Sequence, residues 1–366
     1  MTIELTAKPR TAGLHSVTLD LDDPRTEGVD RKILATVVAA EPLAAPSHTL
    51  AKSGTVQRNA TTSYFIAVPQ GAKALQVAMS GLAAGSQTRW IAITPQGVPA
   101  DPTSTPNCYP NYPNPANTCD PVRRTYQNPA PGVWEFEVEA RRTSPLLDNP
   151  YTLTASTLGT TFEPAVRVLP EVKAGSPTPV TWKVTNASAA FDGTLKGGEL
   201  GSSRTQRPTV KQGESQRYEV VVGSGVSRLD AAIGAPADAK ADLDLSILLG
   251  GKVVASSATG GSDEAVSVAR PAPGTYTVVV DGYEVPAGST AYDYRDVYYS
   301  PALGSLKTDE SKPVKLGSGA STQVTAEVSV AGPAPEGRGF SGEVRLLNPS
   351  GTVTGSGGVR IEKVVP

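Results

Sequence analysis

The chain has 366 residues, enough for two or three domains that each bury a core of their own. Its 33 Lys and Arg residues nearly balance its 35 Asp and Glu residues, and the net charge of −2 excludes strong electrostatic attraction to nucleic acid or to an anionic membrane. The 36 Gly and 32 Pro residues interrupt the sequence at short intervals, and the residues between them favour Val, Thr and Tyr. We therefore expect an all-β protein built from antiparallel sandwiches.

The first 42 residues contain two predicted strands. In the segment 13–24, Val17, Leu19 and Leu21 occupy alternate positions, and the segment 33–38 is largely apolar. A weaker version of this pattern returns at 339–349 and 359–365. We interpret residues 1–42 as the closing half of a truncated sandwich whose opening half lies upstream of Met1.

Targeting signals are not evident in the sequence. The segment 1–10 lacks the basic stretch and apolar core of an export signal, and no run of about 18 apolar residues suits a membrane span. We expect no membrane partner, and we expect export to depend on a longer precursor.

A longer unit occurs twice. The segment from Pro129 to Val138 returns 142 positions later, from Pro271 to Val280, and Thr55 to Val68 returns 154 positions later, from Thr209 to Val222. Trp134, Phe136 and Val138 alternate with glutamates, a pattern typical of a strand with one buried face. We expect one sandwich over residues 50–158 and a second over residues 207–300.

The remaining segments predict a third sandwich. Val180, Trp182 and Val184 alternate with polar residues, as in an early strand of such a domain. We expect residues 160–206 to combine with residues 303–366. The segment 207–300 would then be inserted into this sandwich or docked against it.

The two cysteines lie close together in a proline-rich segment. Cys108 and Cys119 are flanked or separated by five prolines, so the segment is a rigid loop in which a local disulfide closes easily. Two unpaired thiols are the alternative. No histidine is near enough in sequence to suggest a zinc site. A disulfide would point to an extracellular protein.

Catalytic chemistry has few candidate residues. Serine catalysis needs a base, usually histidine, and the chain contains only His15 and His48. Neither accompanies a serine in a Gly-x-Ser-x-Gly turn. We interpret both as structural or solvent-exposed and expect no catalytic residues.

Two groups of side chains are candidates for binding. Asp242 and Asp244 lie on one side of a predicted strand, and Asp263 follows in a nearby turn, so the three carboxylates are a possible Ca²⁺ site. The alternative is a solvated strand face with a capped turn. Tyr292 and Tyr294, with Tyr298 beyond them, are a possible aromatic strip for sugar or peptide. The alternative is that these tyrosines pack against a neighbouring sheet.

Several motifs resemble a known family. The segments 242–245, 253–257, 261–266 and 271–283 resemble the bacterial pre-peptidase C-terminal (PPC) domain, a β-sandwich that follows the catalytic domain of secreted peptidases. The wider arrangement, including the cysteine loop and the segments 19–24, 132–135 and 139–144, is similar to the C-terminal region of large actinobacterial S8, or subtilisin-like, serine peptidases. The resemblance implies PPC-like jelly-roll modules that alternate with fibronectin-III or Ig-like units. The catalytic motifs of the family, His-Gly-Thr-His and Gly-Thr-Ser-Met-Ala, have no counterpart here.

This resemblance implies a function without catalysis. In the family, such regions are thought to stabilise the enzyme, bind substrate or surfaces, or be removed during maturation, and some PPC relatives bind Ca²⁺. We therefore expect a secreted accessory region whose partners are the protease domain of a parent chain and a protein or polysaccharide substrate. The alternative is a stand-alone extracellular β-sandwich protein that binds carbohydrate or protein.

Overall fold

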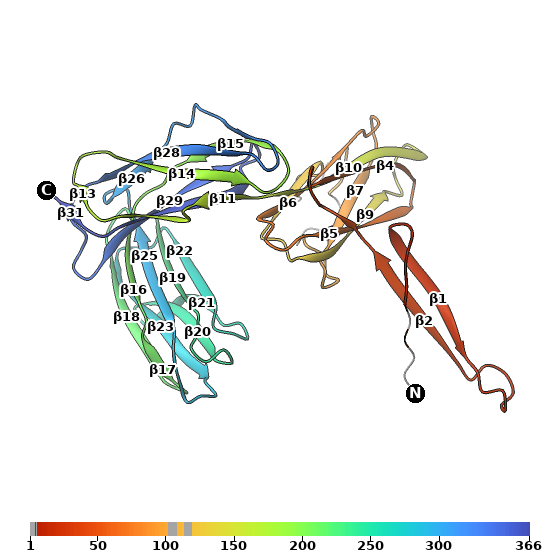
Figure 1. Cartoon of the computed structure of the whole chain (residues 1–366), viewed down its shortest axis with the longest axis horizontal. Helices are drawn as coiled ribbons and strands as arrows, with labels where there is room; N and C mark the ends of the chain where they lie inside the picture. The colour runs from red at the N-terminus through yellow and green to blue at the C-terminus, as the bar shows by residue number, and fades with distance from the viewer. Residues whose placement is uncertain (1–3, 5, 102–107, 113–118) are drawn as a thin grey trace.

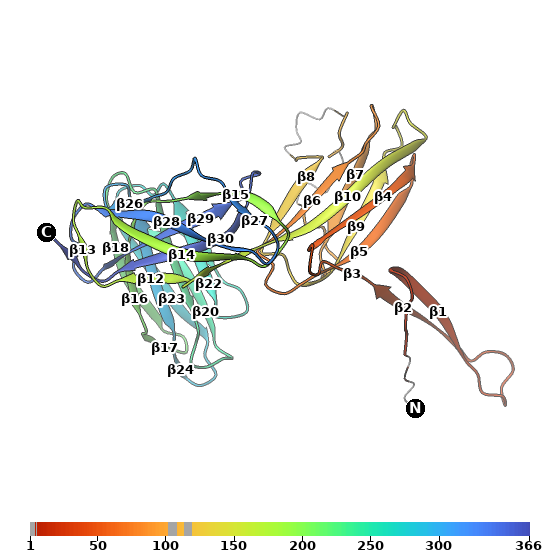
Figure 2. The same ribbon diagram turned by 45° about the horizontal axis from the view of Figure 1, so that its top comes forward.

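All regular elements of the protein are β-strands (Figure 1, Figure 2). The computed structural model describes residues 4, 6–101, 108–112 and 119–366. These ranges contain no helix, and hence none that is long and apolar enough to cross a bilayer. The prediction of an all-β fold is confirmed.

The first two strands form an isolated hairpin. β1 (Gly13–Leu21) and β2 (Arg31–Ala39) pair antiparallel in a two-stranded sheet of their own. Leu19 pairs with Ile33, and because side chains alternate along a strand, Val17 lies on the same face as both. Val17 is 49% exposed and Ile33 is 38% exposed. A two-stranded sheet is marginally stable alone, so this apolar face needs a covering layer.

The first module, residues 41–158, is a sandwich of two four-stranded sheets with the strand orders β4–β10–β6–β8 and β3–β5–β9–β7. Trp90, Trp134 and Phe136 fill its core, and none is more than 3% exposed. Its strands are β3 (Glu41–Pro42), β4 (Thr49–Gln57), β5 (Thr61–Val68), β6 (Ala74–Ser80), β7 (Thr88–Ile93), β8 (Arg123–Gln127), β9 (Gly132–Ala140) and β10 (Asp148–Leu158).

The split sandwich takes its strands from both sides of the second module along the chain. One layer has the order β11–β14–β28–β26, and the other contains β12, β30 and β29 with β15 alongside. Trp182 lies fully buried between them. The strands are β11 (Thr160–Glu163), β12 (Val166–Leu169), β13 (Val172–Lys173), β14 (Thr178–Asn186), β15 (Phe191–Lys196), β16 (Gly201–Gln206), β26 (Gly304–Lys307), β27 (Val314–Leu316), β28 (Ser321–Val330), β29 (Gly339–Leu347), β30 (Val353–Ile361) and β31 (Val364–Val365).

The second module, residues 209–299, is also a sandwich. One layer has the order β18–β23–β20–β21, the other contains β25, β19 and β22, and β17 pairs with β24 at one end. Its buried core is aliphatic except for three tyrosines and contains no tryptophan. The strands are β17 (Thr209–Lys211), β18 (Ser215–Val222), β19 (Arg228–Gly234), β20 (Asp242–Leu249), β21 (Lys252–Ser257), β22 (Glu264–Ala269), β23 (Gly274–Glu284), β24 (Ser289–Ala291) and β25 (Asp293–Tyr299).

Candidate binding groove on a shared sheet

β16 connects the split sandwich to the second module through backbone pairing. On one side it pairs with β29, where Gly201 faces Ser341, and on the other it pairs with β25, where Ser202 faces Tyr298. The resulting sheet has the order β12–β30–β29–β16–β25–β19–β22 and therefore runs through both parts. Figure 1 shows β16 and β25 leading from β29 into the second module. The relative position of the two parts is thus fixed by a common sheet.

A buried carboxylate reinforces this junction. Asp296 on β25 is fully buried, and its two oxygens lie 2.8 Å from Arg204 Nη2 and 2.5 Å from Arg338 Nη2. The Tyr294 hydroxyl donates a third hydrogen bond to Asp296, at 2.9 Å. Burial, and then the nearby Asp296 charge, raise the pKa of Tyr294, so this hydroxyl stays a donor. Arg338 precedes β29, so the cluster ties the split sandwich to the second module.

The other face of the shared sheet is hollowed, and glycine lies beside larger side chains in its lining. Side chains alternate along β25. Tyr294 and Asp296 therefore lie on one face, and Arg295, Val297 and Tyr299 lie on the other. An added Cβ at Gly201 would lie 2.4 Å from Val297 Cγ2 and 2.9 Å from the Tyr299 ring. Only glycine therefore lets the Tyr299 ring lie this close to β16.

Four hollows lie side by side on the open face, with volumes of about 560, 480, 210 and 440 Å³. Glu343 lines the first three and Tyr299 lines the last three. Neighbouring hollows have lining residues in common, so the four adjoin and are treated together as one groove. We call it the shared-sheet groove.

The shared-sheet groove is long enough for an extended polymer. It reaches from Lys73 and Asn128 of the first module, across the split sandwich, to Ala265 on β22. It crosses seven of the nine strands of the shared sheet. At a spacing of about 4.8 Å between strands, this corresponds to roughly 30 Å.

Charged side chains line the groove unevenly. Arg228 lies with its guanidinium 4.4 Å from the centroid of the Tyr299 ring and its Nε 2.8 Å from Asp230 Oδ2. The Ser267 hydroxyl also donates to Asp230, at 2.6 Å. In contrast, Arg295 makes a long hydrogen bond, 3.4 Å from its Nη2 to Ser341 Oγ. The Arg228 guanidinium is thus fixed by partners within the protein, whereas the Arg295 guanidinium has only one weak contact.

The predicted tyrosine strip is wrong. Tyr292 and Tyr294 are both fully buried in the second module. The Tyr292 hydroxyl is 2.9 Å from that of Tyr218, and the Tyr294 ring stacks on the Tyr218 ring with a centroid distance of 3.8 Å. They pack between the two layers of the sandwich and cannot contact a ligand. The tyrosine that sequence analysis missed is Tyr299, which has the opposite strand parity and lines the groove.

The three predicted calcium ligands do not converge. Asp263 accepts a hydrogen bond from the Ala235 backbone N–H at 3.3 Å, so it links the end of β19 to the start of β22. Asp242 and Asp244 lie on β20, and burial, followed by the charges of Asp242, Asp281 and Glu264, raises the pKa of Asp244. Among the described residues, no three His, Cys, Asp or Glu side chains form a group that could hold a metal ion.

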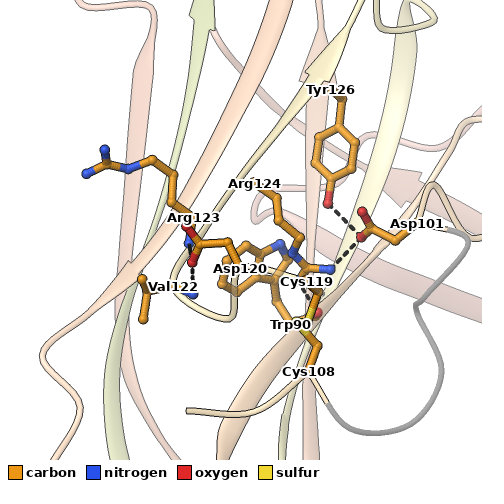
Figure 3. The surroundings of a disulfide bond; sticks show 9 residues. All are labelled: Trp90, Asp101, Cys108, Cys119, Asp120, Val122, Arg123, Arg124 and Tyr126. Carbon is orange, nitrogen blue, oxygen red and sulfur yellow. Dashed lines mark hydrogen bonds and ion pairs between the residues drawn. A yellow bond between two sulfur atoms is a disulfide. The ribbon is translucent and has the colours of Figure 1, made fainter. Parts of the chain in front are cut away.

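The predicted disulfide between Cys108 and Cys119 is present in the first module (Figure 3). Near it, Arg124 lies 4.0 Å above the Trp90 ring, and its Nη1 is 2.5 Å from Asp101 Oδ2. The Tyr126 hydroxyl donates to the same carboxylate, at 2.9 Å, and burial raises the pKa of Tyr126. These contacts stabilise the sheet next to the disulfide. They are consistent with a structural role for the two cysteines.

The two histidines lie apart from the groove. His15 is on β1, where its Nε2 is 2.8 Å from Thr11 O. His48 precedes β4 and has a positive φ of 51°. Neither residue lines any of the four hollows of the shared-sheet groove.

The protein is a chain of several β-modules, and comparisons with known proteins identify two of its segments. Residues 1–39 match the Ig-like domain in actinomycete serine proteases, and residues 214–282 match the bacterial pre-peptidase C-terminal domain. Both are non-catalytic accessory modules. These matches confirm the resemblance to the C-terminal region of S8 subtilisin-like serine peptidases.

A curated relative covers most of the chain. Pyrolysin from Pyrococcus furiosus is 26% identical over 344 residues, which are 91% of this chain and 23% of pyrolysin. The chain therefore spans less than a quarter of that relative. Among solved structures, tripeptidyl peptidase 2 aligns over 96% of this chain and 33% of its own, with a TM-score of 0.45 and 12% identity. A structural likeness at this level carries no argument about function.

Proposed function

We propose that the chain is a non-catalytic accessory region of a secreted subtilisin-like serine peptidase and that it binds polypeptide in the shared-sheet groove. The observation that carries this proposal is the groove itself, which crosses seven strands of a sheet common to two modules. The Ig-like and PPC matches and the similarity to pyrolysin support the link to a protease. The disulfide supports an extracellular location.

The lining favours polypeptide over polysaccharide. The aromatic side chains that line the hollows of the groove are Tyr299 and Phe162. Arg228 covers the Tyr299 ring, and Phe162 is only 6% exposed. A sugar ring would therefore find little free aromatic surface to stack on. The mixture of charged, hydroxyl and small side chains suits a peptide backbone and its side chains instead.

The module arrangement fits a region that presents this groove to substrate. We propose that the chain divides into residues 1–42, 50–158, 160–206 with 303–366, and 207–300, because, Leu43 apart, each of the three large core clusters falls within one of the last three units. The first unit is the closing half of an Ig-like sandwich, supported by the match to residues 1–39 and by the uncovered apolar face of the hairpin. The partner in cis is the protease domain of the parent chain.

A blocked groove tests the binding function. Ser341 lines the groove beside Arg295, so Ser341→Trp places a large ring in the path of a ligand. Val221, which is 70% exposed on β18 in the opposite layer of the second module, provides the matched control Val221→Trp. We expect binding of fluorescein-labelled casein, measured by anisotropy, to weaken about tenfold in Ser341→Trp and to remain unchanged in Val221→Trp. Equal binding by the two variants would argue against the groove as the binding site.

Two further measurements test the assignment to a protease. The purified chain should show no hydrolysis of casein, and an antibody against it should capture from the culture medium a larger polypeptide that contains a protease domain. A species of about the mass of this chain alone would favour the stand-alone binding protein. Retention on insoluble polysaccharide, but not on unfolded protein, would favour carbohydrate as its ligand.

A further inference from the structure

We propose that the shared-sheet groove selects polypeptide segments that carry carboxylates, and that Arg295 is their main anchor. This inference rests on the proposed function and deepens it, because it names the chemistry of the bound segment. It follows from three features of the groove: the position of Arg295, the state of the other charges, and the length of the groove.

Arg295 occupies the middle of the groove without an acidic partner. It lies on β25 and lines both the 440 Å³ hollow and the 480 Å³ hollow. In the flanking strands its register neighbours are Thr205 and Ala232, both uncharged. Among the described residues, no carboxylate lies within ion-pair distance of its guanidinium. A guanidinium has five donors in a planar fork that matches a carboxylate, and only one long hydrogen bond uses them here.

The other charges of the groove leave a basic excess. The basic side chains in its lining are Lys73, Arg228, Arg295, Arg345 and Arg360. The acidic ones are Glu199, Asp230 and Glu343. The whole chain has a net charge of −2, so the basic character of the groove is local.

The acidic side chains of the groove already have partners. Asp230 pairs with Arg228 and accepts from Ser267. Glu199 accepts a hydrogen bond of 2.5 Å from the Ser227 hydroxyl, and Glu343 lies 3.4 Å from Arg345 Nε. Arg360 in turn lies 3.4 Å from Glu362, outside the groove. Asp230 and Glu343 therefore offset Arg228 and part of Arg345, and Arg295 is left as the central cation without an acidic partner. A ligand with carboxylates complements this pattern, whereas a basic ligand would meet Arg295 without compensation.

The groove length sets the size of the probe. An extended chain rises about 3.3 Å per residue, so a groove of roughly 30 Å holds about nine residues. A fluorescein-labelled decamer of alternating Glu and Ser is therefore a suitable ligand. Decamers with Gln or Lys in place of Glu keep the length and change only the charge.

The test compares these three decamers on the full chain by fluorescence anisotropy. We expect the Glu decamer to bind at least about tenfold more tightly than the Gln decamer, and the Lys decamer to bind most weakly. Arg295→Gln should remove most of the preference for Glu. Arg217, exposed on β18 in the opposite layer, provides the control Arg217→Gln, which should keep the preference. Unchanged thermal unfolding of both variants would show that neither substitution disturbs the fold.

Each other outcome is informative. Equal binding of the Glu and Gln decamers, or equal effects of the two arginine substitutions, would overturn this inference. If the Gln decamer binds as tightly as the Glu decamer and Ser341→Trp abolishes both, the proposed function survives without the preference for acid. Binding of an anionic polysaccharide such as polygalacturonate, through Arg295 and without binding of any decamer, would overturn the inference and the proposed function together.

Discussion

Both modules secure the same turn with an aromatic side chain from the strand that follows it. In the first module, Trp134 Nε1 donates a hydrogen bond to Ala130 O at 2.8 Å. In the second, the Tyr276 hydroxyl at the corresponding position donates to Ala272 O at 3.0 Å. The chemical group differs, yet the carbonyl of the same Pro-Ala-Pro-Gly turn receives the bond. The two copies therefore share this hydrogen bond to the turn, although the donor residue is Trp in one and Tyr in the other.

A second common device lies in the two cores. The hydroxyls of Tyr64 and Tyr151 are 2.7 Å apart in the first module, and those of Tyr218 and Tyr292 are 2.9 Å apart in the second. Tyr64 and Tyr218 are repeat-equivalent, since they are separated by the 154 positions of the sequence repeat. Each pair joins the two layers of its sandwich.

The modules differ at their edges. In the first module β4 is a continuous edge strand that pairs with β10 alone. In the second, β16 pairs with β25 in the corresponding place and also with β29 of the split sandwich. The first module instead meets the split sandwich through a small cluster, Ala74, Leu158 and Ala189, and a hydrogen bond of 3.0 Å from Asn348 to Gln76. Because β16 pairs on both sides, one sheet runs through the second module and the split sandwich. The groove lies on that common sheet.

Loss of the buried carboxylate at the shared edge should have the largest effect. Asp296→Ala leaves Arg204 and Arg338 without their common partner in a poorly hydrated site. We expect the free energy of unfolding to fall by about 3 kcal/mol. Hydrogen exchange of β16 and β25 during urea unfolding measures the effect.

A matched control for this substitution exists on the same strand. Asp293 forms an ion pair with Arg207 in which both side chains are more than half exposed. Asp293→Ala should change stability by no more than about 0.5 kcal/mol. If the two substitutions had equal effects, the cluster at Asp296 would not be what holds the second module to the split sandwich.

Removing the disulfide should act on the first module alone. The bond closes a loop with a sequence separation of 11, so the double substitution Cys108→Ser with Cys119→Ser should cost about 2 to 3 kcal/mol. Trp90 and Trp134 contribute fluorescence from this module and Trp182 from the split sandwich, whereas the core of the second module contains no tryptophan. Hydrogen exchange in β18 to β25 should stay at its native level. Loss of protection there would show that the modules unfold as one unit.

The tyrosine pairs should contribute equally in the two modules. Tyr151→Phe and Tyr292→Phe each remove one hydroxyl and leave the hydroxyl of Tyr64 or Tyr218 without this partner. We expect a loss of about 1 kcal/mol in each case, measured by urea unfolding with exchange resolved by module. A loss in only one module would mean that the other pair is incidental to its core.

Much of the fold could be predicted from sequence because it depends on local alternation. The prediction that Trp134, Phe136 and Val138 share a buried face is confirmed, since none is more than 3% exposed. The disulfide also followed from local spacing. In both cases the relevant residues are close together in the chain.

The groove could not be predicted because it depends on distant pairing. Gly201 meets Tyr299 and Ser341, which are about a hundred or more residues away in sequence, and β16 has no apolar alternation that would mark it as a strand. The tyrosine strip failed for a related reason. Alternation correctly groups Tyr292 with Tyr294 but does not say which parity faces the core, and the answer depends on the layer packed against β25.

The smallest expected change in stability concerns one cross-strand pair. In the first module the two residues have opposite charges, and in the second they have like charges. Trp90 pairs with Val138 and Leu245 pairs with Val280, so the preceding residues, Arg89 and Asp244, are equivalent. Arg89 faces Glu139, and its Nη2 lies 2.6 Å from Glu139 Oε2. Asp244 instead faces Asp281, and like charges directly opposite each other destabilise a sheet.

Substitution of Asp244 should therefore stabilise the second module. Burial and neighbouring carboxylates raise the pKa of Asp244, so the folded state disfavours its charged form, and the cost is present at neutral pH and absent below the ordinary value of 3.8. We expect Asp244→Asn to add roughly 0.5 kcal/mol at pH 7, and Asp244→Arg, which copies the pair of the first module, to add about 1 kcal/mol. The gain of the Asn variant should vanish in acid, because both forms are then neutral. A gain that persists at pH 3 would show that packing, and not charge, separates the two modules at this position.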